Sequence, residues 1–171
     1  TTDRIYYLNR YLPIYNKRVK NTAGRDFNTE VQAGFVGEKF RSILTLSNVN
    51  QKIGFFPGSH GIPSVDRLQD DGNYRNIDFP YQKVNHFKVI SENEFRLNTK
   101  DVFKLVTSFQ NNRRQEMSAF HTHYANQQAP EKNPNTELDF DLSTYDTQLK
   151  FEHNHNKNFK TIIGAQAQLQ T

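Results

Sequence analysis

Hydrophobic and polar residues alternate along most of the chain with a period of two, which is typical of β-strands with one apolar and one polar face. The first clear case begins at Phe27, where Phe27, Val31 and Phe35 share a face and the residues between them are mostly polar. No segment shows the period of an amphipathic helix. The pattern predicts six strands, at residues 27–35, 40–51, 83–97, 102–117, 137–153 and 159–169.

Two segments depart from this regular alternation. Residues 1–26 mix a dense aromatic start with a proline and a Thr-Ala-Gly-Arg bend, and we interpret them as loop or strand end. In the strand at 137–153, the apolar row moves from even positions such as Leu138 to odd positions such as Phe151. One extra residue would restore a single apolar face, so the shift predicts a β-bulge near Ser143.

The connections between the predicted strands alternate in length. Three are short, at 37–39, 98–101 and 154–158, and two are long, at 52–82 and 118–136. The loop at 52–82 contains seven glycines and prolines, which bend the backbone, so we expect neither a strand nor a helix to run through these residues. Loops of this length in a compact domain are usually functional or disordered.

This alternation predicts a topology. Successive connections of an up-and-down antiparallel sheet lie at opposite edges, so the short turns are expected at one edge and the long loops at the other. Outer-membrane barrels have this arrangement, together with an apolar lipid face and a polar lumen, and several predicted strands exceed the length that crosses a bilayer. The expected fold is therefore all-β: a partial transmembrane β-barrel of about six antiparallel strands, forming one domain over residues 1–171.

A soluble β-sandwich that binds carbohydrate or protein is the main alternative, because its strands also alternate with period two. The low mean hydropathy of -0.86 favours it, whereas the long strands and the segregated loop lengths favour the barrel. A passive porin is a third interpretation.

The two ends of the sequence lead us to expect that the chain is an excerpt of a larger barrel. The first residues include no initiator Met or signal peptide, and the last residues interrupt an alternating strand.

Composition removes several function classes. The net charge is +4, but the 22 basic and 18 acidic residues are interspersed, which argues against nucleic-acid binding. No stretch approaches the roughly 20 apolar residues of a membrane-spanning helix. The absence of Cys excludes disulfides, thiolate metal sites and a Cys nucleophile.

The sequence contains few clusters of residues that could form a catalytic or metal-binding site. His121 and His123 form one His-x-His pair and His153 and His155 form another, but the two pairs are expected at opposite ends of the sheet. An isolated pair lacks the further ligands that a zinc site needs. Paired aspartates occur as well, without a nucleophile motif or a phosphate loop. We therefore expect no catalytic residue, no metal and no cofactor, and a protein that is not an enzyme.

Candidate ligand-binding residues concentrate in the loop at 52–82 and at the end of the strand at 102–117. Aromatic residues and arginine dominate binding hot spots, and arginine forms charge-assisted hydrogen bonds with anions. Such residues could instead pack the loop or pair with neighbouring carboxylates. The candidates are Phe55, Phe56, Arg67, Tyr74, Arg75, Arg113 and Arg114.

Three runs resemble the barrel region of TonB-dependent outer-membrane receptors: VKNTAGRD at 19–26, the segment from Leu46 to Ser91, and FQNNRRQE at 109–116. The resemblance implies a barrel of roughly 22 strands with an N-terminal plug, located in the cell outer membrane. It also implies energised uptake of a scarce nutrient such as a ferric chelate. The implied partners are that nutrient, outer-membrane lipid, and the TonB energy-coupling complex, which would act through an N-terminal part outside these 171 residues.

Overall fold

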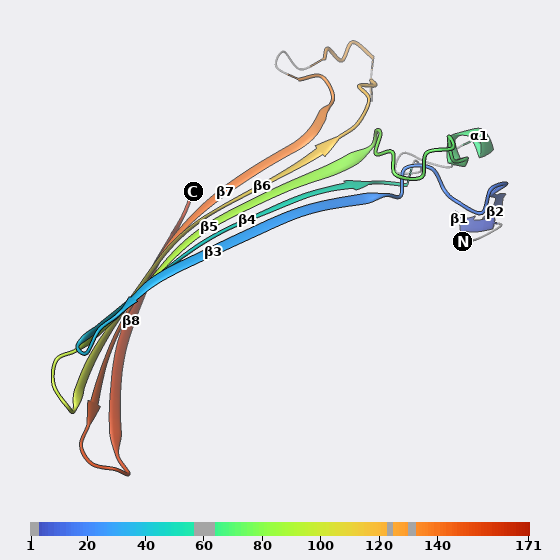
Figure 1. Ribbon diagram of the computed structural model, residues 1–171. Helices are drawn as coiled ribbons and strands as arrows, with labels where there is room; N and C mark the ends of the chain where they lie inside the picture. Colours follow the sequence, from blue (N-terminus) through green and yellow to red (C-terminus); the bar gives the residue numbers. More distant parts are fainter. Residues whose placement is uncertain (1–3, 57–63, 123–124, 130–132) are drawn as a thin grey trace. The chain divides into compact units, whose positions relative to one another are not determined.

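The computed structural model describes residues 4–56, 64–122, 125–129 and 133–171. Within them the chain is all-β apart from one short helix, and it forms an antiparallel sheet of two strands and another of six (Figure 1). The two-stranded sheet is a hairpin of β1 (Arg4–Tyr7) and β2 (Arg10–Pro13). None of the described helices is long and apolar enough to cross a membrane.

The six strands of the larger sheet pair in chain order, each with its neighbours in the sequence. Their bounds agree with the predicted strands to within about three residues at nearly every end, because strict alternation over nine or more residues is a strong signal. They are β3 (Gly24–Val36), β4 (Phe40–Gly54), β5 (Tyr81–Arg96), β6 (Asp101–Met117), β7 (Thr136–Asn154) and β8 (Lys160–Gln170).

The prediction that the short turns lie on the same side of the sheet is confirmed by hydrogen bonds between each of the first two turns and the end of a neighbouring strand. The amide of Arg96, at the end of β5, donates to the carbonyl of Lys39 in the first turn at 2.8 Å. The amide of Asn154, at the end of β7, donates to the carbonyl of Lys100 in the second turn at 2.9 Å. Since the six strands pair antiparallel in chain order, both long loops leave from the opposite strand ends.

The chain divides into two compact units. Unit 1 comprises residues 1–27, 50–84 and 114–140, and it contains the hairpin, both long loops and the adjoining strand ends. Unit 2 comprises residues 28–49, 85–113 and 141–171, and it contains the main lengths of all six strands with the three short turns.

Unit 1 has a small apolar core built outside the large sheet. Leu68 is fully buried, and Leu12 and Ile14 are nearly so. Leu68 lies in α1 (Val65–Leu68), a single helical turn inside the loop between β4 and β5. This core joins the loop to the hairpin and to the segment after it, and its partly buried members are Ile5, Tyr7, Val19, Phe56 and Val65.

Two sequence-based predictions about local structure are wrong. The hairpin lies in the segment interpreted as loop or strand end. The loop between β4 and β5 contains the short helix α1, which includes none of the loop's glycines and prolines. The hairpin and α1 both consist of elements of four residues, which are too short to display a period. The pairing of β7 with β8 shows no β-bulge near Ser143: Ser143 exchanges two 2.9 Å backbone hydrogen bonds with Thr171, and pairing with β8 continues without a break to Asn154.

Candidate functional site

Asn21 holds the base of the loop between β4 and β5. Its Nδ2 donates to the carbonyls of Phe55 at 3.0 Å and Pro80 at 2.6 Å, at the two ends of the loop. Its Oδ1 accepts the backbone N–H of Asp78 at 2.8 Å. The residue is 6% exposed and has a φ of 59°, which Asn adopts more readily than most residues. We call this set of bonds the Asn21 clamp.

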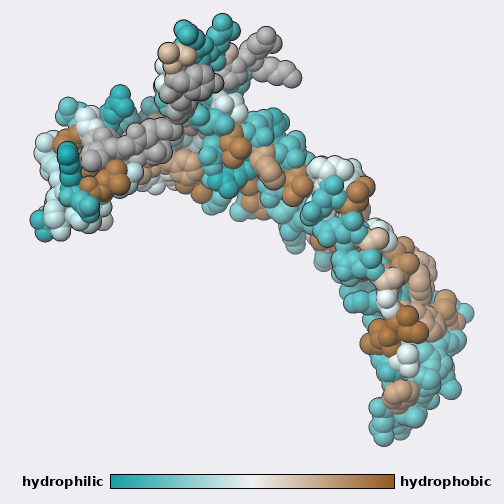
Figure 2. All heavy atoms as spheres, turned by 180° about the vertical axis from the view of Figure 1, so that it is seen from behind, coloured by the Kyte–Doolittle hydropathy of each residue, from teal (hydrophilic) through white to brown (hydrophobic). Residues whose placement is uncertain are grey.

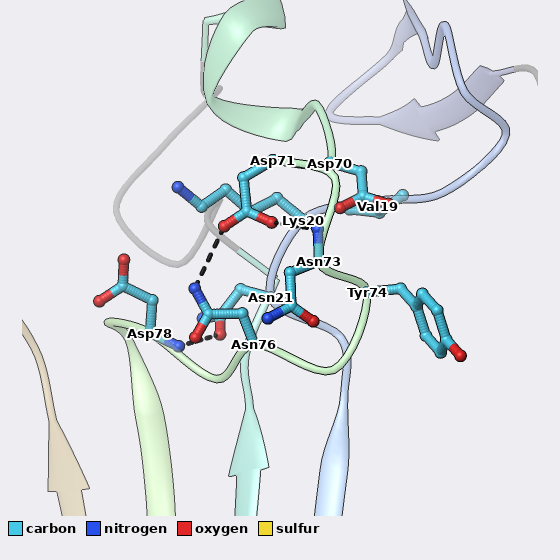
Figure 3. Close-up of a pocket in the computed structure, with 9 residues that line it drawn as sticks. All are labelled: Val19, Lys20, Asn21, Asp70, Asp71, Asn73, Tyr74, Asn76 and Asp78. Atoms are coloured by element: carbon cyan, nitrogen blue, oxygen red, sulfur yellow. Dashed lines mark hydrogen bonds between the residues drawn. The ribbon is translucent and has the colours of Figure 1, made fainter.

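The segment after α1 is shaped by side chains that bond to the backbone nearby. Oδ1 of Asp70 accepts the N–H of Gly72 at 3.1 Å, and Oδ1 of Asp71 accepts the N–H of Asn73 at 3.0 Å. Oδ2 of Asp71 accepts Nδ2 of Asn76 at 3.1 Å (Figure 3). These bonds to Asn73 and Asn76, in that order, hold the pKa of the Asp71 carboxyl below its usual value.

The hollow between this segment and residues 19–21 is very small. Its volume is about 10 Å³, which is enough for a single water molecule. Its lining residues include three aspartates, Asp70, Asp71 and Asp78. Within the described ranges, no three His, Asp or Glu side chains are placed to hold a metal ion. The hollow therefore offers no space for a small-molecule ligand.

Tyr74 is the candidate residue whose surroundings best fit a contact with a ligand. In Figure 3 its ring points away from the other residues that line the hollow, and the residue is 56% exposed. The guanidinium of Arg18 lies over this ring at 4.6 Å from its centre, and that of Arg75 at 5.6 Å. Two cations on one exposed ring form a positive surface with an aromatic centre.

The other loop candidates are placed differently. Phe56 packs its ring edge-on against Tyr7, with centroids 5.3 Å apart, and belongs to the small core of unit 1. Phe55 takes part through its backbone, in the Asn21 clamp and in a 2.9 Å bond to the carbonyl of Pro80. Arg67 is exposed on α1.

The paired arginines of β6, Arg113 and Arg114, project to opposite faces of the sheet. Neighbouring residues of a strand point to opposite faces, so Arg113 and Arg114 cannot both reach a ligand bound on one face. Arg114 bonds Oε1 of Glu116 at 2.5 Å, two residues along the same strand. The structure thus brings Tyr74 and Arg75 together, and it separates Arg113 from Arg114.

One face of unit 2 is apolar and lies open. Ring contacts connect this face from strand to strand: Phe40 lies 4.8 Å from Phe95 and Phe109 lies 5.0 Å from Tyr145, between ring centres. Figure 2 shows hydrophobic residues at the surface over the strands. The following members of what we call the apolar face are between 36% and 66% exposed: Val31, Phe35, Leu44, Leu46, Phe87, Phe95, Tyr145, Leu149, Phe151, Ile163 and Leu169.

Aromatic rings form two rows on the apolar face. The row nearer the short turns joins Phe35, Phe40, Phe95 and Phe103, with consecutive centroids 6.2, 4.8 and 6.1 Å apart. The second row joins Phe87, Phe109 and Tyr145, with spacings of 6.5 and 5.0 Å. On β6 the rows are six residues apart, or roughly 20 Å along the strand.

The opposite face of unit 2, which we call the polar face, carries a chain of charges. Nζ of Lys104 lies 3.9 Å from Glu94 and 2.8 Å from Glu152, and Nζ of Lys160 lies 2.6 Å from Glu152. These four side chains come from four consecutive strands. Glu152 is only 8% exposed although it is charged, whereas the hydrophobic residues of the apolar face lie open. This distribution is the reverse of that in a water-soluble protein.

An open hollow of about 240 Å³ lies beside this chain of charges on the polar face. Its lining is mostly ionic or amide, so it suits water and polar solutes better than an apolar ligand. The lining residues are Arg41, Ile43, Glu92, Asn93, Glu94, Lys104 and Val106.

The histidine pairs have ordinary partners where they are described. Nδ1 of His153 lies 2.5 Å from Oδ1 of Asp101, and Nε2 of His155 lies 2.9 Å from the hydroxyl of Thr161. His123 lies outside the described residues, so its pairing with His121 is not defined.

Two residues of this site were not among the candidates from the sequence, Arg18 and Asn21. Arg18 contacts Tyr74 from 56 positions away in the chain, and Asn21 bonds both ends of a loop that begins more than thirty residues later. Only the folded contacts between these segments identify them. No family model, no curated protein and no solved structure matches the chain.

Proposed function

We propose that this chain forms part of the barrel of a TonB-dependent outer-membrane receptor, with the apolar face of unit 2 toward lipid. The observation that carries the proposal is the inverted distribution of side chains, open hydrophobic residues on one face and partly buried charges on the other. Transmembrane barrels need this distribution because their outer face meets hydrocarbon and their lumen holds water. The two aromatic rows fit the girdles at the borders of the hydrocarbon layer.

A soluble sandwich accounts less well for the apolar face. Sandwich domains bury the inner faces of two sheets against each other. Val31, Phe35 and Ile163 would belong to such a core, yet they are 64%, 62% and 66% exposed. A contiguous apolar surface of this kind marks a membrane or a partner interface.

The organised loop end of unit 1 favours a receptor over a passive porin. The loop between β4 and β5 is held by the Asn21 clamp and by a core of its own around Leu68. A loop fixed in this way can present a defined binding surface. Energy coupling would come from the TonB complex through another part of the protein.

The ligand surface proposed here centres on Tyr74 with Arg18 and Arg75, and Arg67 is an exposed cation on the same loop. A positive aromatic surface suits an anionic chelate, which would gain charge-assisted hydrogen bonds and a stacking platform. Arg114 is already paired with Glu116 and would contribute little.

The test is uptake by intact cells that carry the full-length protein, with radiolabelled ferric citrate as the first probe in a panel of anionic ferric chelates. Uptake that stops when an uncoupler collapses the proton-motive force, while surface binding persists, supports the receptor. Uptake that continues under the uncoupler indicates a porin, and no binding of any chelate removes the proposed ligand class.

Variants of the loop locate the binding surface in the same assay. Tyr74→Ala and Arg75→Ala are each expected to raise the Kd by about tenfold at normal abundance in the membrane, as residues at a binding hot spot do. Arg10→Ala, which removes an exposed arginine from β2, is the matched control and should leave the Kd unchanged. Unchanged affinity in both loop variants would exclude these residues from the site.

A further inference from the structure

Two cations of unit 1 face each other directly across β3 and β4. The amide of Gly54 donates to the carbonyl of Ala23 at 2.9 Å, which sets the pairing of the two strands at this end. Counting two residues inward on each strand places Arg25 opposite Lys52. The two side chains project from the same face, as cross-strand partners do.

The same relation holds between β4 and β5. The amide of Phe55 donates to the carbonyl of Pro80 at 2.9 Å, and counting three residues inward on each strand places Lys52 opposite Lys83. Arg25, Lys52 and Lys83 therefore form one row across three adjacent strands. We call it the basic row.

The basic row has three positive charges, and Asp78 is the carboxylate that interacts electrostatically with Lys52. Like charges directly opposite each other destabilise a sheet. Within the described part of the chain, no ion pair joins any of the three to a carboxylate. Nζ of Lys52 donates to the carbonyl of Ile77 at 3.2 Å and lies 3.9 Å from the centre of the Tyr81 ring.

Tyr81 also belongs to the surface around the row. Nζ of Lys83 lies 5.5 Å from the centre of the same ring, so two ammonium groups approach one aromatic side chain. Arg25 and Lys83 are exposed, and Lys52 is half-buried. Two of the three cations are open to an anion from outside the protein.

The sequence of side chains along the strands points to the source of that anion. On β5, residues at intervals of two share a face, and Lys83 is followed on its face by Asn85 and then by the exposed Phe87. On β4, Lys52 shares its face with Asn48, whose side chain bonds that of Asn85 at 3.1 Å. Cation, amide and hydrophobic residue thus follow one another, as headgroup phosphate, interface and hydrocarbon do in a bilayer.

We propose that Arg25, Lys52 and Lys83 bind the phosphate headgroup of a membrane lipid. The inference rests on the proposed membrane barrel and adds a specific lipid contact to it. Three cations in a row offer charge-assisted hydrogen bonds to phosphate oxygens, and the bound phosphate removes their mutual repulsion. Tyr81 lies where an aromatic ring contacts the interface.

The experiment measures lipid binding by the full-length protein in neutral detergent micelles. The probe is phosphatidic acid, counted on the protein by native mass spectrometry during a titration. The triple variant Arg25→Gln, Lys52→Gln, Lys83→Gln is expected to bind it at least about tenfold more weakly than wild type. Dioleoylglycerol, which has acyl chains without phosphate, should bind wild type and variant equally.

A second triple variant controls for total charge. Lys39→Gln, Lys100→Gln and Lys157→Gln remove three exposed lysines from the short turns and should change the affinity less than twofold. Equal binding by wild type and the basic-row variant would overturn the proposal. So would displacement of the lipid by millimolar inorganic phosphate, since the row would then be a site for a free anion.

Single variants cover the case in which the triple variant does not fold. Arg25→Gln and Lys83→Gln alter exposed side chains and should each weaken binding about threefold, whereas Arg25→Lys keeps the charge and should retain the affinity. Failure of the membrane proposal has a separate signature: strand positions on the apolar face would show no contact with lipid. Lipid contact on that face with unchanged phosphatidic-acid affinity would refute the basic row alone.

Discussion

At the scale of single residues, Asn21 is constrained through both its side chain and its backbone. Its side chain joins Phe55, Asp78 and Pro80, and its backbone takes a positive φ. A Cβ on Gly54 would lie 2.5 Å from the carbonyl oxygen of Asn21, so position 54 tolerates only glycine. The two residues together fix where the loop leaves the sheet.

Replacing Asn21 by Ala should loosen the loop without unfolding the strands. The change removes three partly buried hydrogen bonds, at a cost of about 2–4 kcal/mol of local stability. Hydrogen exchange at Phe55 and Asp78 measures the loss. Thr22→Ala removes one exposed hydrogen bond, to the carbonyl of Val19, and serves as the control. Protection that is equal in both variants would contradict the clamp.

Asp71 supplies a prediction about pH. Its carboxyl pKa is lowered by hydrogen bonds from Asn73 and Asn76, so the stabilisation is present above the unfolded Asp pKa of about 4 and is lost as pH falls through the lowered value. An NMR titration of the Asp71 carboxyl should therefore give a midpoint below that of a free Asp. Asn76→Ala should raise the midpoint, and Asn158→Ala, in a short turn, should not. An unchanged midpoint in Asn76→Ala would refute the assigned cause.

The sequence indicates which residue types in the long loop can bind a ligand. It does not indicate which side chains from distant segments contact them. The guanidinium of Arg75 lies near the ring of Tyr74, and both residues stay predictions as ligand contacts. Phe56 packs in the core beside Tyr7, which is the packing role that the sequence left open for it. The sequence cannot separate these cases, because what surrounds an aromatic side chain depends on segments far away in the chain.

At the scale of elements, alternation predicted the six long strands and failed for short or mixed ones. The hairpin of β1 and β2 and the single turn of α1 are stabilised by the shared core around Leu68 and not by a local pattern. The bulge near Ser143 was inferred from the assumption that one face stays apolar along all of β7. Residues 144–154 of β7 pair with β8 without a break, so no bulge shifts the register of that pair.

Adjacent residues of β6 provide a direct comparison of the two faces. Thr107 lies on the apolar face between the aromatic rows, and Ser108 lies on the polar face. Thr107→Arg should destabilise the protein in lipid vesicles by about 2–4 kcal/mol, the cost of a cation near the middle of the hydrocarbon layer. Ser108→Arg should cost far less, since water reaches that face. Denaturant unfolding in vesicles measures both, and equal losses would contradict the assignment of the faces.

At the scale of the whole molecule, β3 and β8 are the two outermost strands of the six-stranded sheet, and each pairs with only one neighbour. Unpaired backbone groups do not survive in hydrocarbon, and bacterial barrels have eight strands or more. The membrane barrel that we propose therefore requires further strands beside β3 and β8. The alternation of short and long connections was readable from the sequence because turn length depends on local residues alone.

The central claim is that the apolar face of unit 2 contacts lipid and the polar face contacts water. The protein has no Cys, so single cysteines introduced at positions 103–110 of β6 can each carry a nitroxide label. In the full-length protein in lipid vesicles, electron paramagnetic resonance should find high accessibility to oxygen at the odd positions, from Phe103 to Phe109. The even positions, from Lys104 to Gln110, should instead be accessible to a water-soluble nickel chelate. Equal access of the nickel chelate at odd and even positions would contradict the account.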